Sequence, residues 1–145
     1  MIDVINTAWG WTALKPKEIL YENDFGNLLI EDNEGKFWRI CPEELSCKVI
    51  AEDQESFDEL FYTENFKKDW YMDETVALAK DHLGELMSGE KYCLKLPGVL
   101  GGLYEPENFG KISFEKLISF SGAIALEMQD ITPEQLKKII PEEGQ

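Results

Sequence analysis

The sequence predicts an α+β fold, in which an antiparallel β-meander in the N-terminal half packs against helices. One or two later strands and C-terminal helices are expected to complete it. Two observations predict this class: short apolar runs recur about every ten residues between turn residues in the first third, and apolar positions then recur at helical spacing. A length of 145 residues suits a single domain, expected over residues 1–145.

Four strands are expected in the N-terminal half, at residues 18–21, 28–30, 37–40 and 47–51. Each run is rich in apolar residues, and Asn, Asp and Gly residues separate the first three. Short turns join antiparallel neighbours, so the four runs are expected to pair in chain order.

Two helices are expected next. Asp53 is a suitable N-cap for the first, on which Phe57, Leu60 and Phe61 share one face. Asp69 is expected to begin a second, longer helix that stops at residues 88–89. Its apolar positions are Met72, Val76, Ala79, Leu83 and Leu86.

Strands at residues 92–96 and 110–113 and two helices complete the prediction. Ser113 precedes a helix whose buried face is expected to carry Leu117, Phe120, Ile124 and Met128. Residues 132–139 open with Thr, Pro and a Gln at the capping-box position, which predicts a short final helix.

The charge of the chain restricts its partners. There are 29 acidic against 14 Lys and Arg residues, a formal charge of −15. Binding to nucleic acid or to an anionic membrane rests on basic residues, so neither partner is expected. A cation, a small molecule or a basic protein fits better.

The N-terminal residues and the cysteines indicate a cytoplasmic protein. The chain has no basic residue before Lys15, unlike a signal peptide, and no apolar run of the roughly 18 residues that a membrane helix needs. Cys41, Cys47 and Cys93 lack CxxC spacing and are expected to be reduced, mostly buried thiols.

No residue pattern indicates catalysis, a metal site or a cofactor. The glycines near residue 100 match neither phosphate-binding motif, and the single histidine, His82, cannot build a histidine-rich metal site. Residues 32–35 lack the spacing of a calcium loop. We therefore predict no catalytic residues, no metal site and no cofactor.

Clustered carboxylates are the most informative polar feature. Between residues 52 and 59 there are five acids and no base. They are expected either to form a solvated helix face or to steer a basic protein partner, in the way that carboxylates of a nuclease inhibitor imitate phosphates. The candidate partner-binding acids are Glu22, Asp24, Glu31, Asp32, Glu52, Asp53, Glu55, Asp58 and Glu59.

Several ordered motifs resemble a known bacterial family. They are Trp9-Gly10-Trp11 and the segments 22–27, 38–43, 66–71, 92–108 and 117–125. Together they are similar to the C-terminal domain of type VI secretion immunity proteins that neutralise DNase toxins, over roughly residues 6–130. The resemblance implies a toxin-binding protein without catalytic residues.

The family motifs are expected to be structural. Glycines suit a tight loop, Asn a turn and a helical glycine close packing. The motif residues are Pro97, Gly98, Gly101, Gly102, Tyr104, Glu107, Asn108, Ser121 and Gly122. Larger relatives carry an additional N-terminal domain, so this chain is expected to be a stand-alone form. Where those relatives continue into a turn and a closing strand, this chain has the start signal of the final helix, so that strand is expected to be absent or replaced.

The leading hypothesis is a non-enzymatic immunity protein that occludes a cognate nuclease toxin with an acidic surface. Two alternatives remain open at the level of sequence. One is a small-ligand or regulatory protein-binding module, which a pocket beneath residues 97–102 would favour. The other is an enzyme that uses a carboxylate pair, alone or with Cys41 or Cys93.

Overall fold

The computed structural model describes residues 1–129 and 131 and confirms the α+β class. The expected helix at residues 132–139 lies outside the described residues. The elements are α1 (Ile2–Trp9), β1 (Pro16–Glu22), β2 (Leu28–Asp32), β3 (Phe37–Cys41), η1 (Pro42–Glu44), β4 (Ser46–Ala51), α2 (Gln54–Phe61), α3 (Glu64–Tyr71), α4 (Asp73–Leu83), β5 (Glu90–Leu94), η2 (Gly98–Leu100), η3 (Pro106–Asn108), β6 (Phe109–Ser113) and α5 (Phe114–Met128).

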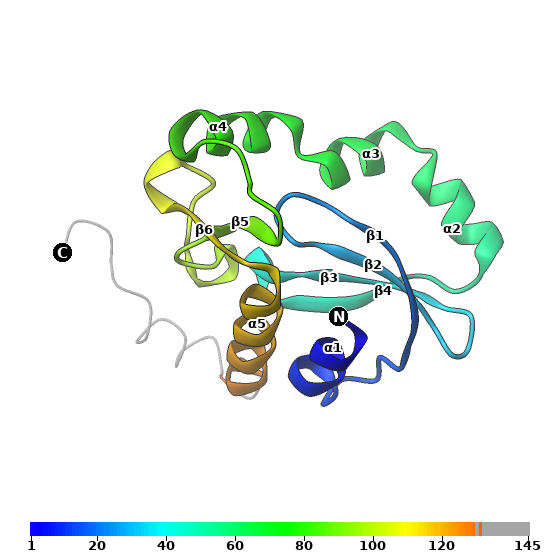
Figure 1. Cartoon of the computed structure of the whole chain (residues 1–145). Helices are drawn as coiled ribbons and strands as arrows, with labels where there is room; N and C mark the ends of the chain where they lie inside the picture. The colour runs from blue at the N-terminus through cyan, green and yellow to red at the C-terminus, as the bar shows by residue number, and fades with distance from the viewer. Residues whose placement is uncertain (130, 132–145) are drawn as a thin grey trace.

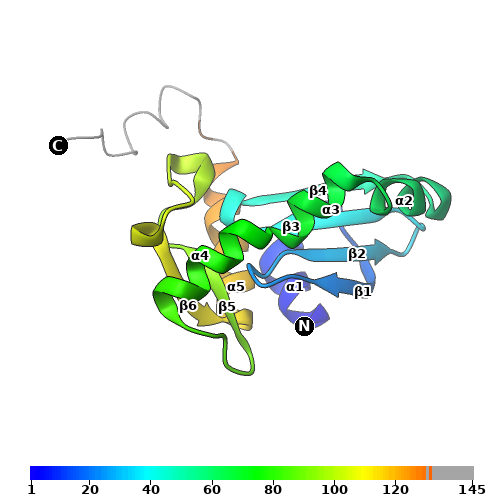
Figure 2. The same cartoon turned by 90° about the horizontal axis from the view of Figure 1, so that it is seen from above.

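The predicted meander is a four-stranded antiparallel sheet in the order β1-β2-β3-β4. Helices α1 and α5 cover one face, and α2 and α3 run across the other, while α4 lies over β5 and β6 (Figures 1 and 2). Because side chains alternate along a strand, β2 is apolar on both faces. Leu28 and Ile30 pack towards α1 and α5, and Leu29 packs with Trp70 of α3.

A second, smaller sheet joins β5 and β6, the late strands that the sequence predicts. Its core contains Phe25, Tyr92 and Phe109, which pack with Ala79 of α4. Phe25 comes from the β1–β2 turn, and its ring centroid lies 5.8 Å from those of both Tyr92 and Phe109. This turn therefore joins the small sheet to the large one.

The predicted cap Asp53 is confirmed, and Ser113, which the sequence places before a helix, is also a cap. The Asp53 carboxylate accepts a hydrogen bond from the Ser56 N–H at 2.8 Å and begins α2. The Ser113 hydroxyl accepts one from the Lys116 N–H at 3.3 Å and begins α5. In both cases the side chain satisfies a backbone donor that has no partner inside the helix.

The predicted long helix from Asp69 is wrong. The segment forms two helices, α3 and α4, separated at Met72, which has a left-handed backbone (φ 51°). Thr63 caps α3, so that Asp69 lies inside this helix rather than at its start. Helix α4 ends before Gly84 (φ 85°) and not at residues 88–89. The apolar periodicity continues across Met72, which explains the error.

The predicted buried face of α5 is only partly correct. Leu117 is buried, but Phe120 is 56% and Ile124 is 37% exposed. The packed face instead contains Ile118, Ser121, Gly122 and Ala125, in addition to Leu117. The small residues on this face allow α5 to approach α1, a helix that the sequence analysis did not predict.

Gly122 is at the closest approach of α1 and α5. A Cβ atom on Gly122 would lie 2.4 Å from the Ala8 carbonyl oxygen. The Trp11 indole N–H donates to that same oxygen at 3.0 Å and lies 3.3 Å from the Gly122 carbonyl oxygen. The family motif residues Trp11 and Gly122 therefore meet at one contact, where the two helices pack closely.

Gly122→Ala is predicted to destabilise the fold by about 1–3 kcal/mol, because the added methyl group would overlap backbone atoms of α1. Urea unfolding followed by circular dichroism measures this change. Ser119→Ala, on an exposed position of the same helix, is the control and should stay within about 0.5 kcal/mol of the wild type. Equal stability of Gly122→Ala and wild type would show that α1 can move away at little cost.

Candidate functional site

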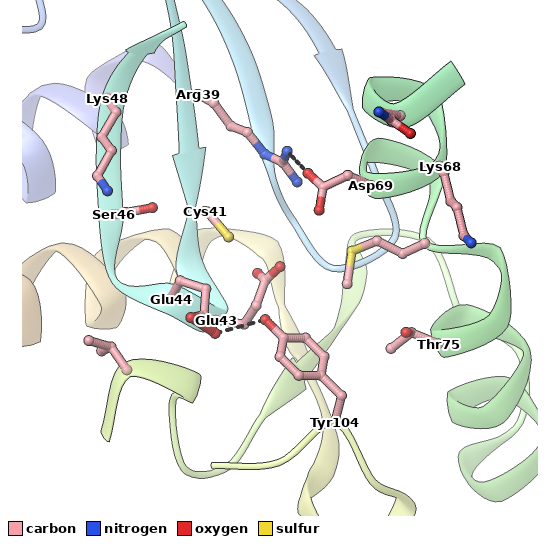
Figure 3. Close-up of a pocket in the computed structure, with 13 residues that line it drawn as sticks. Arg39, Cys41, Glu43, Glu44, Ser46, Lys48, Lys68, Asp69, Thr75 and Tyr104 are labelled. Carbon is pink, nitrogen blue, oxygen red and sulfur yellow. Dashed lines mark hydrogen bonds and ion pairs between the residues drawn. The ribbon is translucent and has the colours of Figure 1, made fainter. Parts of the chain in front are cut away.

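A cleft of about 890 Å³ lies between the β3–β4 connection and the α3–α4 junction (Figure 3). We call it the η1 cleft, because Glu43 and Glu44 of η1 line it. Arg39 and Cys41 extend the same wall, and Asp69 and Met72 belong to the opposite wall. Val99 and Tyr104 come from the loop between β5 and β6. The cleft therefore combines segments that are far apart in the sequence.

Glu43 is a buried carboxylate in the wall of the cleft, with 4% exposure. The Asn27 amide nitrogen donates to its Oε1 and Oε2 atoms, at 3.0 and 2.9 Å. Burial raises the pKa of Glu43, while the hydrogen bonds from Asn27 oppose that rise. A buried carboxylate requires such donors, because desolvation without hydrogen bonds is costly.

Arg39 extends this contact across the sheet. Its Nε–H donates to the Asn27 Oδ1 at 2.9 Å, and its guanidinium group forms an ion pair with Asp69 of α3. The Arg39 Cζ atom also lies 5.2 Å from the centre of the Trp70 ring, a cation–π arrangement. The relay from Glu43 through Asn27 and Arg39 to Asp69 therefore connects η1, the β1–β2 turn, β3 and α3.

Asn23 holds the turn that positions Asn27. Its Oδ1 accepts hydrogen bonds from the N–H groups of Phe25 (3.1 Å) and Asn27 (2.9 Å), and its Nδ2 donates to the Trp70 carbonyl oxygen at 2.8 Å. Gly26 between them has φ 73°, a conformation that glycine adopts readily. These contacts give structural roles to the family motif at residues 22–27.

Glu44 is held by two residues of the loop between β5 and η3, residues 95–105, which we call the glycine-rich loop. The Tyr104 hydroxyl donates to Glu44 Oε1 at 2.8 Å (Figure 3). The same carboxylate packs against Gly98, where a Cβ atom would lie 1.7 Å from Oε1. Burial and the charges of Glu43 and Glu44 raise the pKa of Tyr104, so its hydroxyl remains a hydrogen-bond donor.

Asn108 holds the rest of this loop. Its Oδ1 accepts from the Leu96 N–H at 2.9 Å, and its Nδ2 donates to the carbonyl oxygens of Leu96 (2.9 Å) and Leu103 (3.0 Å). Gly101 has φ 100°, and a Cβ atom on Gly102 would lie 1.8 Å from the Leu96 carbonyl oxygen. Both glycines are therefore required by backbone geometry, as their motif predicted.

The remaining motif residues lie in or beside this framework. The Pro97 carbonyl oxygen accepts from the N–H groups of Leu100 and Gly102, both at 3.0 Å. Ser121 is buried and donates its hydroxyl to the Ile118 carbonyl oxygen at 3.1 Å. Glu107 is exposed in η3, and no contact in the structure explains its place in the motif.

The three thiols are free and partly buried. Burial raises the pKa of Cys41, which the charge of Glu43 raises further, and burial raises the pKa of Cys47 to about 11. Burial also raises the pKa of Cys93. All three are therefore protonated near neutral pH and unsuited to nucleophilic attack. Within residues 1–129, no three His, Cys, Asp or Glu side chains group as metal ligands.

The structure sets one of the nine candidate acids, Asp32, apart from the other eight. Asp32 is buried, and its carboxylate accepts hydrogen bonds from the Glu34 and Lys36 N–H groups and the Trp38 indole. Burial alone would raise the pKa of Asp32, but these hydrogen bonds, the one from Trp38 foremost, outweigh it and lower the pKa. Its geometry is that of a turn-stabilising residue, and we leave it out of the proposed contact surface.

The other acids differ in whether a lysine neutralises them. Three form ion pairs: Glu22 with Lys91 at 3.6 Å, Glu31 with Lys17 at 4.0 Å and Glu52 with Lys36 at 4.0 Å. Asp24, near the β1–β2 turn, is exposed. The last four are exposed at or on α2 and have no ion pair among the described residues. They are Asp53, Glu55, Asp58 and Glu59.

A second cavity of about 430 Å³ lies under the glycine-rich loop. Val99 and Leu100 of this loop line it together with Trp11, Leu45 and Ala125. Its walls are mostly apolar, which suits a small apolar group.

The family of this chain follows from a match to a family model. The model described as "T6SS immunity protein Tdi1, C-terminal" matches residues 51–125, just over half of the chain. The chain belongs to this family. This match confirms the family resemblance that the sequence motifs indicate.

A solved structure shares the fold. The chain is similar to the crystal structure of Atu4351 from Agrobacterium tumefaciens, with a TM-score of 0.54 and 19% sequence identity. The match covers 84% of this chain and 62% of that chain. No curated protein matches the chain. In the part of the chain that the structure describes, no helix is long and apolar enough to cross a membrane.

The region that the immunity-protein family matches extends from the end of β4 into α5. It includes the acids of α2, the α3–α4 wall of the η1 cleft and the glycine-rich loop. The carboxylates of the opposite wall, Glu43 and Glu44, precede the matched region. The cleft therefore joins the matched segment to the N-terminal sheet.

The burial of Glu43 predicts a pH dependence of stability. Its raised pKa means that the folded chain retains a proton that the unfolded chain releases above the ordinary value of 4.5. The contribution of Glu43 to the free energy of unfolding is therefore full below pH 4.5 and is lost as pH rises through the raised pKa.

Glu43→Gln removes the titrating carboxyl group, so the stability of the wild type is compared with that of this variant. We expect the stability of the wild type, relative to the variant, to decrease between pH 4.5 and neutral pH. Urea unfolding at several pH values measures the difference. A constant or increasing difference over this range would contradict the assignment. Ser119→Ala, which changes no titratable group, should show a pH-independent difference from the wild type.

Proposed function

We propose that this chain is a non-enzymatic immunity protein that binds a cognate secreted toxin, a nuclease, and neutralises it through an acidic surface. Membership of the immunity-protein family carries the proposal. The acidic surface is formed by α2 and its N-terminal residue Asp53. We place the encounter in the cytoplasm, where a nuclease toxin meets DNA.

The charge distribution supports this surface. Helix α2 contains Glu55, Asp58 and Glu59 and no basic residue, and Phe57 anchors its opposite face in the core. A nuclease surface that binds phosphates is basic, so carboxylates at this helix would attract it over several ångströms and speed the encounter. Tyr62, 73% exposed directly after α2, adds an aromatic side chain of the type that often anchors interfaces.

The product of the neighbouring gene is the first partner to test as the toxin. Co-expression of this chain should restore growth to cells that produce the toxin, and the purified proteins should form a complex. The triple variant Glu55→Gln, Asp58→Asn and Glu59→Gln should lower the association rate about 10-fold at low salt. The wild-type rate should also decrease as salt screens the charges.

A matched triple variant shows whether the position of the removed charges matters, or only their number. Glu18→Gln, Asp81→Asn and Glu115→Gln remove three exposed charges outside α2 and should change the rate by less than about 3-fold. No complex with the toxin and no protection would refute the immunity role. A salt-independent rate, or equal effects of both triple variants, would refute the contact through α2.

A ligand-binding module is the second candidate function, favoured by the cavity under the glycine-rich loop. If this cavity accepts apolar ligands, the dye 1-anilino-8-naphthalenesulfonate should bind the folded chain with increased fluorescence. Leu100→Asp should reduce that increase, because it places a charge in the lining. Val49→Asp, on an exposed residue of β4 outside the lining, is the control. No binding of the dye by the wild type would count against this function.

A further inference from the structure

We propose that the η1 cleft receives a basic side chain, lysine or arginine, from the bound toxin, and that the Glu44 carboxylate is its acceptor. This inference rests on the proposed function, because it assigns a second contact to the same partner. It adds a recessed contact, distinct from the exposed acids of α2.

Glu44 is already oriented in the free protein. The Tyr104 hydroxyl donates to its Oε1 at 2.8 Å. Gly98 has no Cβ atom, and the carboxylate occupies the space that a Cβ atom would fill. Its Oε2 atom has no hydrogen bond among the described residues. An acceptor held in this way loses little side-chain entropy when a partner binds. The arrangement also gives a purpose to Gly98 and Tyr104, two motif residues that form no part of the core.

The charges of the cleft wall favour a cation. Neither Glu43 nor Glu44 forms an ion pair with any residue of the described chain, and the charge of Arg39 is already engaged by Asp69. Glu43 and Glu44 both raise the pKa of the Tyr104 hydroxyl, and Glu43 raises that of the Cys41 thiol. These shifts agree with a negative potential at η1, which an ammonium or guanidinium group would neutralise.

The remaining walls suit the carbon chain of such a residue. Met72 and Val99 line the cleft, and the ring of Tyr104 extends into it (Figure 3). Lysine and arginine place their methylene groups along apolar surface while the charged end reaches a polar group. The flexible thioether of Met72 can adjust to either stem, and the Tyr104 ring can attract the cation.

Two lysines also line the cleft and define the opposite possibility. Lys48 and Lys68 have no ion pair among the described residues, and both are exposed. Water screens an exposed charge more than a half-buried one, so Glu44, held in place by Tyr104, acts on an occupant more strongly than either exposed lysine. An anionic occupant would instead depend on these lysines, which makes the two occupants distinguishable by mutation.

Glu44→Gln tests the proposal directly. It keeps the shape of the side chain and an acceptor for Tyr104, but removes the charge. The dissociation constant for a catalytically inactive form of the cognate toxin should rise about 10- to 100-fold, the usual effect of losing a charged hydrogen bond. Isothermal titration calorimetry measures it. Glu105→Gln, which removes an exposed charge from the same loop outside the cleft, should change the constant less than about 3-fold.

Gly98→Ala keeps the charge and displaces it. The added Cβ would lie 1.7 Å from Glu44 Oε1, so the flexible carboxylate must leave Tyr104 while the backbone stays in an ordinary conformation. The dissociation constant should rise at least about 5-fold. Circular dichroism and thermal unfolding confirm that each variant is folded.

The outcomes separate this proposal from the proposed function. If the wild type binds no toxin, both fail. If the wild type binds and Glu44→Gln binds equally well, only the cleft contact fails. Weaker binding by Lys48→Met and Lys68→Met, with full binding by Glu44→Gln, would overturn the basic occupant in favour of an anionic one.

Discussion

The buried amide of Asn27 is the interaction on which the other features of this fold depend. It is completely buried, donates to both oxygens of Glu43 and accepts from Arg39. A carboxylate removed from water is stable only with such donors, so Asn27 makes the burial of Glu43 possible. Through Arg39 the same amide reaches Asp69, which ties α3 to the sheet. One side chain thereby sets the distance between the two walls of the η1 cleft.

The apolar packing and this polar relay have complementary roles. The sheet is covered on both faces, so strand β2 is buried throughout its first three residues, 28–30, and cannot shift its register without exposing them. On this rigid support, η1 presents Glu44 at a fixed position, where Tyr104 and Gly98 hold it. A site supported by strands and a hydrogen-bonded loop is more exact than one on a free loop. This rigidity is what an inhibitory surface requires, because it lowers the entropy lost on binding.

The negative charge of the chain is divided between structure and surface. Asp32 is consumed by a turn, Asp53 caps α2, and Glu43 is part of the relay. Other acids face lysines, so their charge is partly neutralised. Among the nine candidate acids, those that neither pair with a lysine nor are buried are Asp24, Asp53 and the three acids of α2. The overall charge of −15 therefore indicates a basic partner less directly than the position of these few acids does.

The sequence by itself determined the α+β class, the four paired strands, the cap Asp53 and the family, because each depends on contacts within a few residues or on local composition. It did not reveal α1, the break at Met72 or the packed face of α5, since these depend on which helix lies opposite. Nor did it reveal the η1 cleft. The contacts that build the cleft join residues separated by 16 positions (Asn27 and Glu43), 30 positions (Arg39 and Asp69) and 60 positions (Glu44 and Tyr104). Such partners are brought together only by the tertiary structure, because no periodicity or spacing in the chain encodes contacts over these separations.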